Sequence, residues 1–139
     1  MRSARFAFAI VAWLFLIGIV VQVFLAGVGF FVPGLDSFSY HRSLGWLLHL
    51  TPLLVLVFAS VARSGRDTIW LTVALAVLMA IQPFLPELRT NAPFLAALHP
   101  VNALAIFWLA QAIARRASAL IKGPEPVAKP ASTEQEATA

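Results

Sequence analysis

Three histidines are the residues of this chain best suited to chemistry, because an imidazole ring can bind a metal ion or move a proton near neutral pH. His41 and His49 stand in "SYHRSLGWLLHLTP" (residues 39–52), and His99 stands in "LHPVN" (residues 98–102). Each lies within or at the edge of a strongly apolar segment. An unpaired imidazole in hydrocarbon costs free energy, so we expect these rings to meet each other or a ligand.

Other kinds of enzyme chemistry find little support in the sequence. The absence of cysteine excludes disulfides, thiolate metal sites and thioether attachment of haem. The six acidic residues fall in the connecting segments and near the C-terminus. A paired-carboxylate site and a Ser-His-Asp arrangement therefore both lack parts. No glycine-rich nucleotide-binding loop is present either.

The composition predicts that a lipid bilayer is the main partner of the chain. Hydrophobic residues make up 60% of it and charged residues 12%, whereas soluble domains average about 25% charged residues. The net charge of +4 does not indicate nucleic-acid binding, because the basic residues lie at the ends of the apolar segments. That distribution encodes the topology of a membrane protein.

Four apolar runs predict an all-α membrane protein, a four-transmembrane-helix bundle within residues 1–118. The predicted spans are 6–31, 43–62, 68–84 and 95–115. The first two are followed by the breakers "VPGLDS" and "RSGRD", and the third ends around Pro83 and Pro86. The first run is longer than a signal-peptide core and no A-x-A-like site follows it, so we expect it to be retained. Residues 119–139, rich in Pro, Ala, Glu and Thr, predict a disordered cytoplasmic tail.

The basic residues predict that both termini face the cytoplasm. Under the four-span arrangement, eight of them fall on the side of the termini and two on the other, which satisfies the positive-inside rule. The eight are Arg2, Arg5, Arg63, Arg66, Arg115, Arg116, Lys122 and Lys129, and the two are Arg42 and Arg89.

Each predicted span carries a strongly polar side chain at a similar depth. Counted from the cytoplasmic end at about 1.5 Å per residue, these side chains lie roughly 18–24 Å up their helices. They are Gln22, His49, Gln82, His99 and Asn102. By the same count, His41 lies farther from the cytoplasmic end, at roughly 31 Å. We expect the first five to face inward as one polar layer in the outer half of the bilayer.

Two readings of this layer follow. In the first, His49 and His99 are axial ligands of a haem b, because their helices run in the same direction and bis-imidazole ligation favours electron transfer. Gly45 would let the flat ligand approach the backbone. His41 is an alternative ligand, and Arg42 is either a solvated anchor or a partner of a haem propionate. Binding of one zinc or copper ion by all three histidines is disfavoured, because His41 and His49 lie about 12 Å apart along one helix.

In the second reading, the polar layer only holds the helices in register. The protein would then be a non-enzymatic accessory or scaffold subunit of a larger membrane complex. A homo-oligomer is compatible with either reading, and a proton or solute path through the layer would require one.

Three segments carry a resemblance. "HRSLGWLLHL", "MAIQPFLP" and "LHPVNALAIFWLAQAIARR" resemble a family of small four-span bacterial membrane proteins of unknown function, which implies the bacterial plasma membrane. Their order is also similar to one half of haem A synthase, where a His-Arg pair opens the second helix and another histidine opens the fourth. This second resemblance implies that His41 and His99 are the haem ligands. The chain lacks the other half and the acidic residue before the His-Arg pair, so haem A synthesis is not implied.

Overall fold

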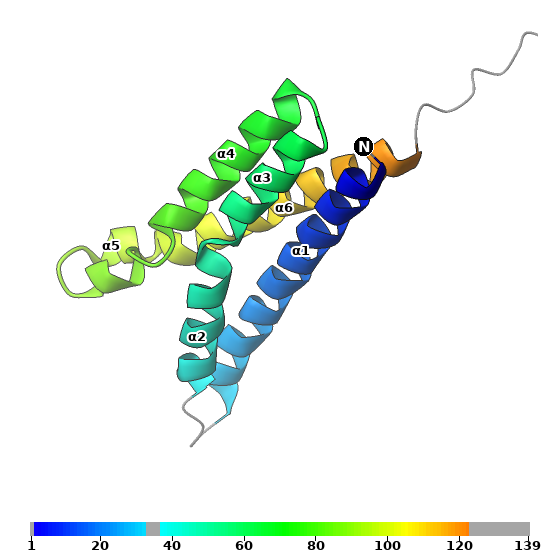
Figure 1. Cartoon of the computed structure of the whole chain (residues 1–139). Helices are drawn as coiled ribbons and strands as arrows, with labels where there is room; N and C mark the ends of the chain where they lie inside the picture. The colour runs from blue at the N-terminus through cyan, green and yellow to red at the C-terminus, as the bar shows by residue number, and fades with distance from the viewer. Residues whose placement is uncertain (1, 33–36, 123–139) are drawn as a thin grey trace, which may run out of the picture.

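The computed structural model describes residues 2–32 and 37–122, and across these ranges the chain is helical without a strand (Figure 1). The predicted all-α class is therefore confirmed for the described residues. The elements in chain order are α1 (Arg2–Phe31), α2 (Ser37–His49), α3 (Thr51–Val61), α4 (Arg66–Ile81), the 3-10 helix η1 (Pro86–Arg89), α5 (Pro93–Ala96) and α6 (Leu98–Lys122).

Within residues 2–32 and 37–122, three helical stretches are long and apolar enough to cross a membrane. They are Arg2–Phe31, Phe38–Val61 and Pro93–Lys122. The third predicted span forms α4, whose 16 residues extend only about 24 Å, less than the roughly 30 Å of a hydrocarbon core. The structure fits the predicted count of four helices when α2 and α3 are counted as one span.

Several helix ends differ from the predicted ones. The second span begins at Ser37 rather than 43, and it breaks at Leu50 because Pro52 has no N–H to donate to the Leu48 carbonyl. α6 runs past the predicted end at 115 to Lys122, since arginine and alanine are good helix formers. Residues 119–122 of the predicted tail are thus helical, and the rest of that tail lies outside the described residues.

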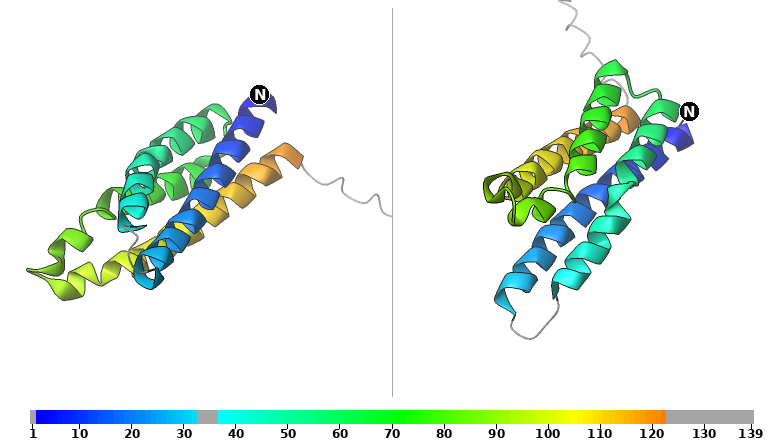
Figure 2. Two further views of the ribbon diagram at one scale, coloured as in Figure 1. Left: turned by 90° about the horizontal axis from the view of Figure 1, so that it is seen from below. Right: turned by 90° about the vertical axis from the view of Figure 1, so that its left-hand side faces the viewer.

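The helices close into a bundle at one end and spread apart toward the other (Figures 1 and 2). α1 packs against α6, α2 and α3, while α4 packs against α3 and α6. Small residues on α1 and α6 are buried, which lets the two backbones approach closely. They are Ala9 and Ala12 on α1 and Ala110, Ala114 and Ala117 on α6.

The N-terminal part of α1 is tied to the last turns of α6. Arg5 Nη1 donates to the Leu120 carbonyl at 3.2 Å, and Trp13 Nε1 donates to Ser118 Oγ at 2.9 Å. The α3–α4 connection lies at the same end (Figure 1). This end therefore gathers the basic residues predicted to share one side, apart from Lys129, which lies outside the described residues. Arg42 and Arg89 lie on elements of the opposite end.

Candidate functional site

His41 and His99 lie side by side, although 58 positions separate them in the chain. Their ring centroids are 6.3 Å apart and their planes meet at 69°. His41 lies near the start of α2 and His99 in the first turn of α6, and both are half-buried. The ring pair therefore connects α2 with the start of α6, at the end where the helices spread apart.

Each ring is held through its Nδ1 by a backbone carbonyl. His41 Nδ1 lies 3.0 Å from the carbonyl oxygen of Gln22, and His99 Nδ1 lies 3.1 Å from that of Gln82. A carbonyl oxygen only accepts, so Nδ1 must donate in both bonds. In the neutral ring Nε2 then carries no proton and keeps its lone pair. A metal-binding histidine is typically oriented in this way.

Hydrogen bonds join His99 to the end of α4. Gln82 Nε2 donates to the His99 carbonyl at 3.1 Å, which reciprocates the bond from the ring. Asn102 Nδ2 donates to the Leu78 carbonyl at 2.9 Å and to Gln82 Oε1 at 2.6 Å. The predicted polar residues Gln82, His99 and Asn102 thus form one network, which fixes the first turn of α6 against α4.

Gln22 and Gly45 meet on the other side of the site, where α1 contacts α2. A Cβ on Gly45 would lie 2.9 Å from Gln22 Nε2, so the side-chain amide fills the space that the missing side chain leaves. Gly45 therefore accommodates Gln22, whereas the sequence predicted that it would admit a flat ligand. Gln22 Oε1 is buried and has no hydrogen-bond partner within the described part of the chain.

His49 lies apart from this cluster. Its ring contacts Trp46 on the same helix, with centroids 5.6 Å apart, and it lies about 12 Å from His41 along α2. The depth count favoured His49 as the neighbour of His99, but the ring that contacts His99 is that of His41. The helices run obliquely to one another (Figure 1), so positions counted along separate axes are not heights in a common frame.

Two phenylalanines that the sequence did not single out extend the site. The Phe38 ring meets His41 edge-on at 6.4 Å, and Phe30 of α1 meets Phe38 at 5.2 Å. The spacing of Phe38 one turn before His41 was the available signal. Arg42, the next residue after His41, is exposed. Among residues 2–32 and 37–122, no three His, Cys, Asp or Glu side chains gather closely enough to hold a metal ion.

Comparison with known proteins adds one likeness. Residues 22–90, just under half of the chain, match a family of unknown function, DUF6220. The chain is similar to this family. The matched segment contains His41 and both glutamines of the site but ends before His99 and Asn102. No curated protein and no solved structure matches the chain, haem A synthases included.

Proposed function

We propose that the protein is a multi-pass protein of the bacterial plasma membrane, with both termini in the cytoplasm, that binds one haem b between His41 and His99 and serves in electron transfer. The observation that carries this proposal is the ring pair itself. Both Nδ1 atoms are engaged by carbonyls, and both Nε2 atoms keep a lone pair for iron.

The proximity of the two rings supports this ligand. Their centroids are 6.3 Å apart, so His41 from α2 and His99 from α6 would hold the haem together. A porphyrin would bring four ligands of its own, so His41 and His99 would be enough to hold it. A bare metal ion would require further protein ligands, and the described residues offer no group of three.

The chemistry of the site supports electron transfer rather than gas binding. If both His41 and His99 hold the haem, the group would supply electron transfer rather than a place for a gas to bind. Arg42 follows His41 in the chain, and its guanidinium would pair with a propionate of the haem. Under the proposed topology, His41 and His99 lie toward the outer face, where a redox partner outside the cytoplasm would reach them.

Absorption spectra of the full chain, purified from haem-replete cells, test the proposal. We expect a Soret band, visible bands that sharpen on reduction, and one haem per chain. His41→Ala and His99→Ala should each abolish or shift these bands. His49→Ala is the matched control, since it removes a half-buried imidazole from the same helix as His41, and it should leave the spectrum unchanged.

Two outcomes would contradict the assignment. A colourless wild-type protein would refute haem binding. Loss of the spectrum in His49→Ala, with retention in His41→Ala, would make His49 the second ligand.

A structural role is the second candidate, as an accessory subunit of a membrane complex or a homo-oligomer. The network of Gln82, His99 and Asn102 favours it, because these side chains already satisfy one another across α4 and α6. This candidate requires a colourless protein that copurifies with a partner or with copies of itself. Its histidine variants should then alter stability alone.

A further inference from the structure

Within the described residues, Arg5 is a half-buried cation without a counter-ion. Its Nη1 donates to the Leu120 carbonyl, and its Nε is buried with no hydrogen-bond partner in that part of the chain. The acidic residues within the described ranges are Asp67 and Glu87, and neither pairs with it. A buried charge is stable only when an opposite charge or a set of hydrogen bonds compensates the lost solvation. The Arg5 guanidinium can therefore bind an anion from outside the described residues.

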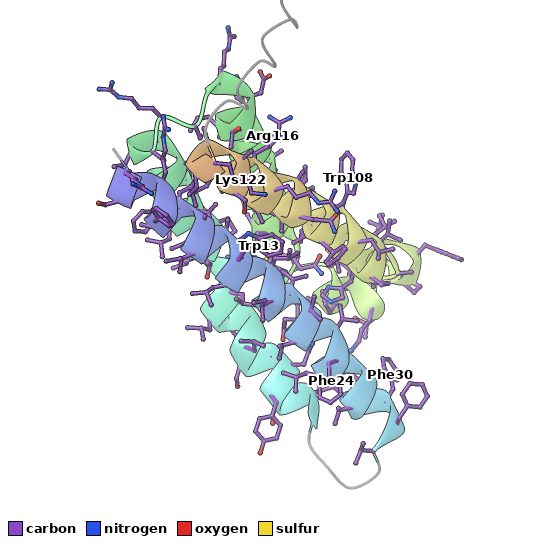
Figure 3. The ribbon with its side chains drawn as sticks, turned by 90° about the vertical axis from the view of Figure 1, so that its right-hand side faces the viewer. Trp13, Phe24, Phe30, Trp108, Arg116 and Lys122 are labelled. Atoms are coloured by element: carbon purple, nitrogen blue, oxygen red, sulfur yellow. The ribbon has the colours of Figure 1, made fainter. Side chains whose placement is uncertain are left out.

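The surroundings of Arg5 combine positive charge with exposed apolar side chains. Seven described basic residues lie toward this end, against the single acid Asp67. The Arg2 guanidinium lies 6.0 Å over the Phe6 ring, and Phe6 and Trp13 are both exposed. Figure 3 shows Trp13 on α1 and Arg116 and Lys122 on α6 along one face, with the basic pair nearer the end of the bundle. An amphiphile with an anionic head above apolar chains matches this arrangement.

We propose that the first turns of α1 and the last turns of α6 bind the phosphodiester headgroup of an anionic phospholipid. Arg5 is the main contact, while Arg116 and Lys122 add charge. The guanidinium presents forked donors suited to phosphate oxygens, and basic residues beside a membrane span attract anionic leaflets. The proposal rests on the membrane embedding and is independent of the haem.

Thermal unfolding of the full chain in neutral detergent micelles tests this site. Added phosphatidylglycerol should raise the Tm, whereas phosphatidylcholine or inorganic phosphate at the same concentration should not. Arg5→Gln should raise the phosphatidylglycerol concentration needed for half of the shift about fivefold. Arg89→Gln is the control, because it removes an exposed arginine at the opposite end and should behave as wild type.

Three results would overturn the proposal. They are an equal shift with phosphatidylcholine, an equal shift with inorganic phosphate, and an undiminished response in Arg5→Gln. If Arg5→Gln does not fold, the double variant Arg116→Gln/Lys122→Gln replaces it, because both side chains are exposed, and its undiminished response would be equally decisive. A colourless protein that still responds to phosphatidylglycerol would refute the haem and leave this site standing.

Discussion

Asn102 shows how a single polar side chain holds two helices together. Its Nδ2 donates to the Leu78 carbonyl and to Gln82 Oε1, and Gln82 in turn holds His99 through reciprocal bonds. The Leu78 carbonyl also accepts from the Gln82 backbone N–H. The position of the His99 ring therefore depends on a residue that makes no hydrogen bond to it within the described structure.

Replacing Asn102 with leucine tests that dependence. Asn102→Leu should lower the free energy of unfolding by about 1 kcal/mol, the usual scale of a hydrogen bond between membrane helices. The measurement is unfolding in mixed micelles of increasing SDS content. Gln111→Leu is the control, since Gln111 is also half-buried on α6 but makes no hydrogen bond within the described structure. Equal stability of the two variants would show that the network does not hold α4 to α6.

At the scale of elements, glycines on α1 determine how closely α2 approaches. A Cβ on Gly29 would lie 2.8 Å from the Phe38 ring, and one on Gly18 would lie 2.8 Å from Leu48. Among the described residues, nothing lies within 4 Å of a Cβ added to Gly27, two positions before Gly29. The α1–α2 contact thus requires glycine at positions 18 and 29, whereas it tolerates a side chain at position 27.

This contrast predicts opposite effects of the same substitution. Gly29→Ala should destabilise the fold by about 1–3 kcal/mol, because the Phe38 ring must move. Gly27→Ala should be neutral or stabilise it by up to about 1 kcal/mol, since alanine is the better helix former. Unfolding in SDS measures both. Because Phe38 contacts His41, Gly29→Ala should also shift the proposed haem spectrum, and equal behaviour of the two variants would contradict the α1–α2 packing.

For the whole molecule, the lack of cysteine makes the orientation directly testable. Ser3 lies at the end that carries most of the basic residues, and Thr90 follows η1 at the other end; both are exposed. In intact bacteria, a membrane-impermeant maleimide should label Thr90→Cys, whereas Ser3→Cys should react only after permeabilisation. The reverse pattern would place the basic end outside and turn His41 and His99 toward the cytoplasm.

The all-helical class was predictable from composition, because apolar runs of this length satisfy their backbone hydrogen bonds in lipid only as helices. The polar residues inside those runs identified most of the site for the same reason, since a polar group in an apolar helix needs an internal partner. The separation of basic residues into two ends followed from the order of the runs. These are properties of each segment taken alone.

The pairing of His99 with His41 rather than His49 was decided only by the tertiary structure. The tertiary structure also decided that Gln22 packs against Gly45. Both depend on how α1, α2 and α6 cross, and on the break at Leu50 that separates α2 from α3. Crossing geometry is set by contacts between segments far apart in the chain, such as the buried alanines of α1 and α6. No count along a single helix contains that information.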